Sequence, residues 1–347
     1  MTPLFFACQK GHKNIVEYLM KYGADINKES HIRKYSVKYK TDIVYYGRTP
    51  LFFACQKGHK NIVEYLMKYG ADINKESHIR KYSMKYKTDI VYYGRTPLFF
   101  ACKEGHENIV KYLVEHGTDI NKESYVKRLK KFSWELGTEE VSRGQTPLFF
   151  ACKKGHENIV KYLVEYGANI NKENNNGITP LYIACENGYT AVVKYLVELG
   201  ADINKQDNHD NTPLFMACNK RDIRIVKYLV ELGADLNKEG SKGRTPLFIA
   251  CENGYKDIVE YLVKHGADIN KENDDGRTPV YIACEKNHMT IVKYLVVGHG
   301  ASLFKEKHLE LDNHDMDYDD DDDLHDSFLN DSDNEFNESD FICSDNE

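Results

Sequence analysis

The chain has 347 residues, of which 41% are hydrophobic and 29% charged, a balance typical of a soluble protein with a sizeable core. No apolar run approaches the roughly 20 residues that a membrane-spanning helix needs, and the first residues lack the pattern of a secretory signal. Residues 1–94 hold 17 Lys/Arg and 8 Asp/Glu, whereas residues 308–347 hold 17 Asp/Glu and no Lys/Arg. We therefore expect a cytoplasmic or nuclear protein with no membrane span, a basic front and an acidic tail.

Thr-Pro dipeptides divide most of the chain into eight units. The intervals between their prolines are 47, 47, 50, 33, 33, 33 and 33 residues. A period of this size predicts a stack of repeated units, because a single unit cannot bury its apolar face alone. The eight prolines, which are all those in the chain, are Pro3, Pro50, Pro97, Pro147, Pro180, Pro213, Pro246 and Pro279.

The unit at residues 179–204, TPLYIACENGYTAVVKYLVELGADIN, predicts two helices. Thr179 can accept hydrogen bonds from the first free amides of a helix, and Pro180 suits the first helical turn, which needs no N–H. Small apolar residues then recur at helical spacing as far as Gly188, so that another helix can approach closely. A second helix with a broad apolar face ends at Gly200, because glycine adopts the left-handed conformation at low cost.

This unit resembles the ankyrin repeat, which has a 33-residue period and a Thr-Pro-Leu-His signature. The resemblance covers residues 2–304. It implies a helical repeat solenoid, in which β-hairpin and α-hairpin units form an ankyrin repeat domain over residues 1–307. One departure is uniform, since an aromatic residue replaces the signature His and adds apolar area at each junction. The replacing residues are Phe5, Phe52, Phe99, Phe149, Tyr182, Phe215, Phe248 and Tyr281.

The first three loops between units exceed the others by 14, 14 and 17 residues. The insertions span about residues 29–48, 76–95 and 123–143. In the first two, aromatic or apolar residues alternate with basic or polar ones, which favours extended strand. We predict two hairpin fingers, each with a basic face and an aromatic face, the latter including Tyr35 and Tyr45 in the first finger.

The third insertion has a different spacing of apolar residues. Within residues 125–140, YVKRLKKFSWELGTEE, the apolar side chains are those of Val126, Leu129, Phe132 and Leu136. This spacing is nearer to the helical period than to alternation, so we predict a short basic helix here.

Two later units depart from the pattern at their turns. Unit 6 has Arg221 and Asp222 where the family has Gly-His, and unit 8 has Asn287 in place of the turn Gly. Unit 8 also carries one extra residue within residues 296–302, VVGHGAS. We expect this extra residue to cost little stability, because nothing stacks on the last helix.

Nine cysteines are present, and eight of them follow Ala at one position of each unit. No two are spaced as a zinc-binding CxxC pair, so we predict buried packing residues and no metal site. Cys343, in the tail, is expected to be a free thiol. The eight repeated cysteines are Cys8, Cys55, Cys102, Cys152, Cys185, Cys218, Cys251 and Cys284.

The resemblance also assigns structural roles to two sets of polar residues. Histidines after the turn Gly are implied to hydrogen-bond between turns, and asparagines that end each motif of the Ala-Asp-Ile-Asn type are implied to fix loop backbone. The histidines are His12, His59, His106 and His156. The asparagines are Asn27, Asn74, Asn121, Asn171, Asn204, Asn237 and Asn270.

No phosphate-binding glycine loop, nucleophile motif or metal-ligand spacing is present. The sequence therefore favours a monomeric, non-catalytic scaffold that needs no cofactor and binds a protein partner on the concave face and loop tips of the stack. The alternative is binding of nucleic acid or another anionic surface through the basic, tyrosine-rich fingers, since tyrosine can stack on bases and Lys/Arg can contact phosphates. Ankyrin stacks rarely bind nucleic acid, which makes this alternative the weaker one.

Candidate partner-binding residues lie in the fingers, before the turn glycines and at the loop tips. The finger candidates are Lys34, Tyr35, Lys38, Tyr39, Lys81, Tyr82, Lys85 and Tyr86. The candidates before the turns are Lys103, Lys153, Lys154, Glu186, Asn187, Lys220, Glu252 and Asn253. The loop-tip candidates are Asn208 and His209.

The tail, residues 308–347, is too self-repulsive to form a core, and we expect it to be disordered. Ser332 and Ser344 each precede an acidic residue by three positions, which is a pattern that acid-directed kinases favour. We expect the tail to contact the basic fingers within the same chain. The alternative is that it only increases solubility.

Overall fold

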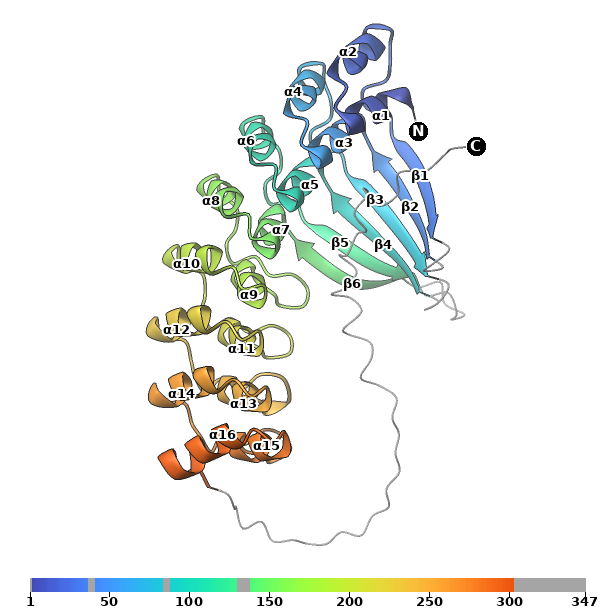
Figure 1. Ribbon diagram of the computed structural model, residues 1–347. Helices are drawn as coiled ribbons and strands as arrows, with labels where there is room; N and C mark the ends of the chain where they lie inside the picture. The colour runs from blue at the N-terminus through green and yellow to red at the C-terminus, as the bar shows by residue number, and fades with distance from the viewer. Residues whose placement is uncertain (1, 37–40, 84–87, 130–137, 303–347) are drawn as a thin grey trace, which may run out of the picture. The chain divides into compact units, whose positions relative to one another are not determined.

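The computed structural model of the chain describes residues 2–36, 41–83, 88–129 and 138–302. These residues fall in one compact unit, Met1–Leu303, and the second unit, Phe304–Glu347, lies outside the described residues. Eight helix pairs, one for each Thr-Pro unit, follow one another in the described part, and a single antiparallel sheet lies beside the first four pairs (Figure 1).

The first helix of each unit begins at its Thr-Pro proline, as predicted. In units 3 to 8 the threonine Oγ1 accepts a hydrogen bond from the backbone N–H three residues later, at 3.1–3.4 Å. Thr2 and Thr49 make no such bond. The first helices are α1 (Pro3–Lys10), α3 (Pro50–Lys57), α5 (Pro97–Glu104), α7 (Pro147–Lys154), α9 (Pro180–Glu186), α11 (Pro213–Asn219), α13 (Pro246–Glu252) and α15 (Pro279–Glu285).

The second helices bury one apolar face and expose the other face to solvent. The last of them is shortened and continues as a π-helical turn, Tyr294–Gly298, which accommodates the extra residue of unit 8. The second helices are α2 (Lys13–Lys21), α4 (Lys60–Lys68), α6 (Glu107–Glu115), α8 (Glu157–Glu165), α10 (Thr190–Glu198), α12 (Ile223–Glu231), α14 (Lys256–Lys264) and α16 (Met289–Lys293).

One continuous core runs through the stack, because each first helix packs against the first helices of the neighbouring units. The aromatic residues that replace the signature His are buried at these junctions in units 1 to 7. Phe52 and Phe100 have ring centroids 4.2 Å apart, and Phe99 and Phe150 have centroids 4.3 Å apart. Tyr281 of unit 8 is exposed. The expected apolar gain is therefore confirmed at seven positions and absent where no later unit covers the ring.

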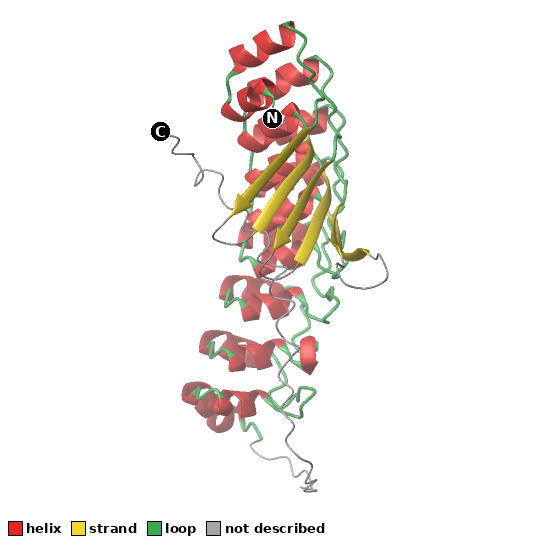
Figure 2. Cartoon of the chain, turned by 90° about the vertical axis from the view of Figure 1, so that its right-hand side faces the viewer, coloured by secondary structure: helices red, strands yellow, loops and turns green. Residues whose placement is uncertain are grey.

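The three insertions combine into one six-stranded antiparallel sheet, with strand order β1-β2-β3-β4-β5-β6. Each insertion forms one hairpin, and neighbouring hairpins also pair with each other through β2–β3 and β4–β5. Figure 2 shows this sheet beside the helices of the first four units. The strands are β1 (Ser30–Ser36), β2 (Thr41–Arg48), β3 (Ser77–Ser83), β4 (Thr88–Arg95), β5 (Ser124–Leu129) and β6 (Thr138–Gln145).

The short helix predicted in the third insertion is wrong for the described residues. Val126 and Leu129 lie in β5, which pairs with β4 from Tyr93–Tyr125 to Ile90–Arg128. Phe132 and Leu136 lie outside the described residues. The preceding hairpin offers an unpaired strand edge, and pairing with it overrides a weak local preference for helix.

The predicted faces of the fingers are also wrong in one respect. Tyr35 pairs directly with Asp42, so these two residues share a face, while Tyr45 lies on the opposite face with Ile43. In this hairpin the odd-numbered residues of β1 pair with the even-numbered residues of β2. If the alternation of side chains in β1 is continued unchanged through the turn, the side chains of β2 are therefore assigned to the wrong faces of the sheet.

Candidate functional site

The inner face of the sheet belongs to the core of the stack. Tyr45, Ile79, Tyr92 and Val126 succeed one another across β2 to β5, and all four are buried in the main core cluster. This face therefore attaches the hairpins to the helices.

Two buried arginines anchor the hairpins at the point where they join the first helices. Arg48, only 2% exposed, has its guanidinium carbon 4.0 Å from the ring centroid of Tyr45 and 4.9 Å from that of Phe52. The guanidinium carbon of Arg95 lies 4.6 Å from the ring centroid of Tyr92. Cation–π attraction offsets part of the cost of burying these charges. Neither cation is exposed to bind an external anion.

The outer face of the sheet carries a row of aromatic and imidazole rings, which we call the ring ladder. His31 stacks on Tyr46 with centroids 4.7 Å apart, His78 lies 5.0 Å from Tyr93, and Tyr93 stacks on Tyr125 at 4.9 Å. Strand pairing also places Tyr46 beside His78. The ring ladder therefore crosses five strands, from β1 to β5, and its members are half-buried or exposed.

The rest of the outer face is mixed in charge. Arg80 lies between Val44 and Val91 in the cross-strand order, and Tyr82 pairs with Asp42. The two valines are buried, whereas Arg80, Tyr82 and Asp42 are half-buried. The described outer face is therefore aromatic and polar, with both signs of charge, and is not a uniformly basic surface.

The finger candidates named from the sequence divide between the two faces. Tyr35 and Tyr82 lie on the outer face, whereas Lys81 pairs with Ile43 on the inner side. Only the strand position of Lys34 is described. The remaining finger candidates, Lys38, Tyr39, Lys85 and Tyr86, lie outside the described residues.

The positions before the turns differ in exposure. In units 1 to 7 the first residue of each pair is half-buried or buried, with Lys103 only 6% exposed, whereas Glu285 of unit 8 is exposed. The second residue is exposed at Lys154, Asn187, Lys220 and Asn253. The amides of Asn187 and Asn253 donate to carbonyl oxygens of their own helices, at 2.8 and 3.0 Å. Lys153, Glu186 and Glu252 are half-buried.

The structure shows the implied bonding between units for three of the four histidines and for all seven asparagines. The Nε2 atoms of His59, His106 and His156 lie 3.0–3.1 Å from a carbonyl oxygen of the preceding unit. The Oδ1 atom of each of the seven asparagines accepts a hydrogen bond from a backbone N–H of the following unit, at 2.8–3.3 Å. These residues are therefore committed to the scaffold.

Sequence reasoning did not assign structural roles to several other residues at the turns. His288 also reaches the preceding unit, with Nε2 3.1 Å from the carbonyl oxygen of Glu252. Asp222 caps α12 by accepting the N–H groups of Arg224 and Ile225. Arg221 and Asn287, the residues that replace turn glycines, have φ of 60°. These roles could be inferred from the sequence, because each turn lies at a regular distance after its Thr-Pro dipeptide.

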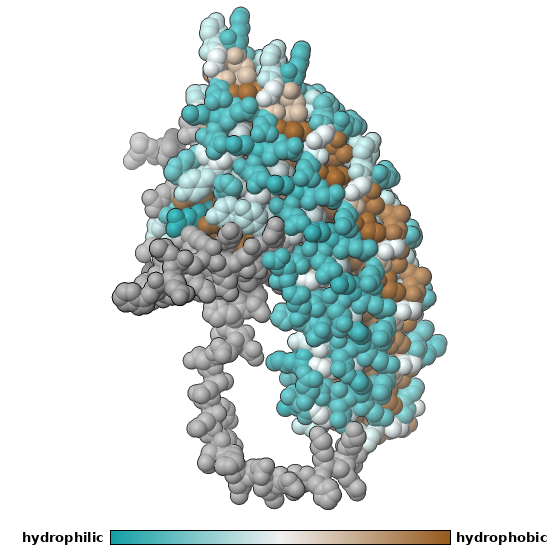
Figure 3. Space-filling view, turned by 180° about the vertical axis from the view of Figure 1, so that it is seen from behind, coloured by the Kyte–Doolittle hydropathy of each residue, from teal (hydrophilic) through white to brown (hydrophobic). Residues whose placement is uncertain are grey.

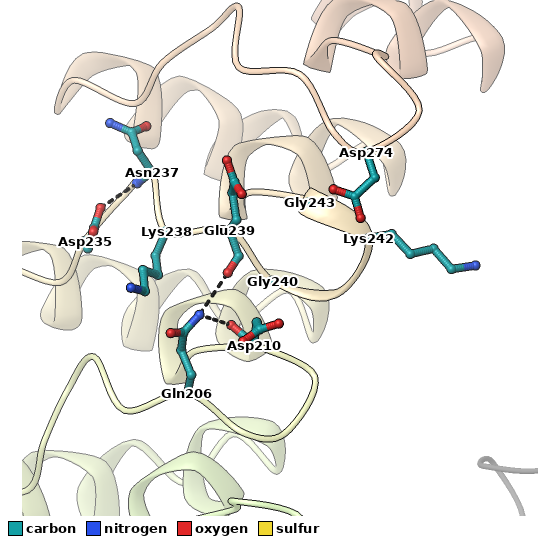
Figure 4. A pocket seen from close by; sticks show the side chains of 10 residues that line it. All are labelled: Gln206, Asp210, Asp235, Asn237, Lys238, Glu239, Gly240, Lys242, Gly243 and Asp274. Atoms are coloured by element: carbon teal, nitrogen blue, oxygen red, sulfur yellow. Dashed lines mark hydrogen bonds between the residues drawn. The ribbon is translucent and has the colours of Figure 1, made fainter.

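A polar cleft of about 480 Å³ opens between the loop tips of units 5 to 8. Gln206 bridges two loops there, donating through Nε2 to the carbonyl oxygens of Asp210 and Glu239 at 2.7 and 3.0 Å (Figure 4). The side chains of Lys238 and Lys242 point in different directions and do not converge on the cleft (Figure 4). This arrangement lacks the convergent set of polar groups that a small-molecule site needs.

The cleft lies where a ladder of ion pairs between neighbouring units is interrupted. Lys205 contacts Glu173 at 3.0 Å, and Lys271 contacts Glu239 at 2.6 Å. At the intervening junction, the position equivalent to the glutamate is Gln206, opposite Lys238. The cleft therefore marks a junction at which a residue substitution has removed one ion pair of the scaffold. The loop-tip candidate Asn208 takes part in scaffold contacts too, donating to the carbonyl oxygen of Asn175 at 2.6 Å, and His209 beside it is exposed.

The second helices present a separate row of aromatic residues that also joins units. Lys161, Lys194 and Lys227 each place their ammonium 5.4–5.7 Å from the ring centroid of a tyrosine in the next unit. Figure 3 shows hydrophobic residues in a broken band along the edge formed by these helices, on a surface that is otherwise largely hydrophilic. Leu199 and Leu232, which directly follow α10 and α12, are nearly half exposed.

The cysteines are packing residues in seven of the eight units. Burial raises the pKa of the Cys8 thiol to about 12, and burial likewise raises the pKa of the next six thiols. The prediction of burial is wrong for Cys284, which is exposed because α15 belongs to the last unit of the described part of the chain. The described ranges contain no cluster of three metal-ligating side chains, and no helix within them is long and apolar enough to cross a bilayer.

Helix pairs joined by hairpin loops and stacked on a 33-residue period define a helical repeat solenoid. A family model for ankyrin repeats in three copies matches residues 1–77, 75–124, 122–207 and 199–273, and a model for a single ankyrin repeat matches residues 275–307. The chain therefore belongs to the ankyrin-repeat family, whose repeats are generally protein-interaction modules. A search of curated proteins finds no match to this chain.

Proposed function

We propose that this chain is a non-catalytic scaffold that recognises a protein partner through the outer face of its inserted sheet. The ring ladder carries this proposal. Its five rings lie on the sheet face opposite the core, so the packing of the repeats does not account for them. Tyrosine-rich surfaces with a neighbouring arginine are typical of protein interfaces, and Arg80 lies in the next row.

The rigidity of the sheet supports the same function. Six paired strands hold the rings in fixed positions, so little side-chain freedom is lost when a partner binds. The exposed residues that end the first helices, Lys154, Asn187, Lys220 and Asn253, offer further contacts along the stack. Exposed His209 and the polar loop tips near it do the same for the later units.

Binding of nucleic acid or another polyanion is the weaker candidate. Arg48 and Arg95 are buried and therefore cannot contact phosphates. Lys75, in the basic region of residues 1–94, also contacts Glu29 at 2.6 Å, so this cation takes part in a scaffold contact. Asp42 adds a negative charge to the outer face. Fewer cations are therefore available to a polyanion than the 17 Lys/Arg of residues 1–94 indicate.

A matched pair of variants tests the proposed function. The face variant combines Tyr46→Ser, Tyr93→Ser and Tyr125→Ser. The control variant combines Tyr18→Ser in α2 with Tyr69→Ser and Tyr166→Ser, which directly follow α4 and α8. Both sets remove three tyrosine rings that lie outside the first-helix core. Circular dichroism and thermal melting verify that each variant remains folded.

Partners captured by cross-linking to the wild-type chain are purified, and their affinity for all three proteins is measured by calorimetry. We expect the face variant to lose at least tenfold in affinity, about 1.4 kcal/mol, and the control to remain within about twofold. Equal loss in both variants, or none in either, contradicts a partner site on the sheet. Capture of nucleic acid alone, with salt-dependent binding, would favour the weaker candidate.

A further inference from the structure

Strands β1 and β3 have the same sequence but different neighbours. Both read SHIRKYS, and both pair on one side with a strand that reads TDIVYYGR, namely β2 for β1 and β4 for β3. On its other side β3 pairs with β2, a second TDIVYYGR strand. Within the described residues, nothing pairs with the corresponding side of β1. Strand β3 therefore shows how a strand of this sequence is paired on the side that β1 leaves open. We call β3 the filled copy of β1.

The tyrosine side chain is more exposed in β1 than in β3, as expected when one edge of the strand is unpaired. Tyr35 in β1 is 53% exposed, whereas the equivalent Tyr82 in β3 is half-buried. The same difference continues into the helices of unit 1. Phe6 is 49% exposed, while the equivalent Phe53 is 1% exposed and contacts Phe5 of the preceding unit. Unit 1 thus exposes a strand edge and the ring of Phe6, both of which have covered equivalents in unit 2.

We propose that the open edge of β1 binds an extended segment of a partner protein as a seventh, antiparallel strand, and that the segment resembles Thr-Asp-Ile-Val-Tyr-Tyr. An edge strand presents unpaired N–H and C=O groups, which give affinity for any extended chain. The neighbouring side chains give the preference for sequence. This inference concerns the edge of the sheet and does not depend on the function proposed for its outer face.

The pairing of β2 with β3 defines the register of the bound segment. Tyr46 opposes His78, Tyr45 opposes Ile79, and Asp42 opposes Tyr82. On β1 the same positions are His31, Ile32 and Tyr35, since the two strands are identical. We therefore place an aromatic residue of the partner opposite His31 and an acidic residue opposite Tyr35. The residue opposite Ile32 is apolar or aromatic, because this position faces the core in the filled copy.

A second folded copy of this chain is a poor source of the bound strand. Its two TDIVYYGR strands, β2 and β4, are each paired on both sides. Its other edge strand, β6, is approached closely near Gly144, where an added Cβ atom would lie 2.7 Å from the carbonyl oxygen of Glu173. The segment is accordingly expected from a different protein, as an extended and otherwise unpaired stretch of chain.

The main-chain part of the proposal is tested with labelled peptides of residues 41–48 and the full-length protein. Two peptides carry N-methyl groups, one on the residues equivalent to Asp42, Val44 and Tyr46, the other on those equivalent to Ile43 and Tyr45. Successive N–H groups of a strand point to opposite edges. Fluorescence anisotropy is expected to show binding of the unmodified peptide and at least a tenfold difference between the two methylated peptides. No binding of the unmodified peptide, or equal binding of the methylated pair, overturns the proposal.

The register is tested by disulfide trapping on a full-length variant that carries Ile32→Cys, with Cys284→Ser and Cys343→Ser to remove competing thiols. One peptide has cysteine at the position of Tyr45 and the other at the position of Val44. We expect the first to cross-link at least fivefold faster, because only that residue opposes Ile32 in the register of β2 on β3. Equal rates overturn the proposed register. Adding Tyr93→Ser and Tyr125→Ser to this variant is expected to leave trapping unchanged, which separates the edge from the ring ladder.

Discussion

At the scale of single residues, the requirement for glycine at a turn depends on the side chain that the following unit packs against it. Gly58 has φ of +79°, and a Cβ atom there would lie 2.7 Å from the imidazole of His106. The same imidazole bonds to the carbonyl oxygen of Gln56 through Nε2, at 3.0 Å. Since a carbonyl oxygen only accepts, Nε2 carries the hydrogen. The glycine therefore provides both a left-handed turn and the space for the next ring.

Gly58→Ala and Gly70→Ala separate these two contributions. Both positions have positive φ, but no atom lies within 4 Å of a Cβ placed at Gly70. We expect Gly70→Ala to lower the free energy of unfolding by about 1–2 kcal/mol through backbone strain. Gly58→Ala is expected to cost about 1–3 kcal/mol more, because the methyl group displaces the imidazole. Urea titration followed by circular dichroism measures both, and equal losses would exclude the steric contribution of His106.

At the scale of elements, the two ends of the described stack differ from its interior, because within the described residues each end unit packs against one neighbouring unit only. The ring of Phe6 in α1 and the side chains of Tyr281 and Cys284 in α15 are exposed, whereas their equivalents inside the stack are buried. Identical repeat positions thus have different environments, and exposure depends on the place of the unit in the array. Stability in such arrays is the sum of unit and interface contributions, so the ends are the least stabilised.

Thiol labelling tests this difference between the ends and the interior. On the Cys343→Ser variant at pH 8, we expect a maleimide reagent to add once, at Cys284, while the chain is folded. The other thiols are buried, and their raised pKa keeps them protonated at this pH. In denaturant, mass spectrometry is expected to show eight adducts. More than one rapid adduct on the folded chain would mean that an interior junction opens.

At the scale of the whole molecule, the opposite charges of the front and the tail favour contact within the chain. Residues 1–94 have a net charge of +9 from 17 Lys/Arg and 8 Asp/Glu, and residues 308–347 have −17. A single exposed ion pair contributes only about 0.2–1 kcal/mol, but a tether gives an effective concentration near millimolar. We propose that several weak pairs together let the tail compete with acidic partners.

Deletion of residues 308–347 is expected to strengthen binding of a polyanion such as heparin at low salt. A second variant retains the tail with every Asp and Glu changed to Asn and Gln, so that its length is unchanged. We expect both variants to bind similarly and more tightly than the wild-type chain, with a difference that disappears as salt screens the charges. Unchanged binding at low salt would show that the tail does not cover the front and would leave solubility as its role.

The sequence alone determined the units, their helix boundaries and most of the core, because these depend on local and periodic signals. Thr179 and Pro180 begin a helix wherever the unit lies, and the small residues after them suit only a closely packed face. The bonding of His106 and Asn74 to neighbouring units was implied in the same way, by position within a repeat. The surface candidates before the turns were less accurate, since the burial of Lys103 depends on its neighbours in space.

Only the tertiary structure decided how the three insertions combine. Strand pairing between hairpins joins residues more than 30 positions apart, such as Tyr46 with His78 and Tyr93 with Tyr125, and no local period records it. This pairing made a strand of the segment that contains Val126, set the two faces of each hairpin and assembled the ring ladder. The open edge of β1 has the same origin, because a strand becomes an edge through the absence of a neighbour, and its own residues do not encode that absence.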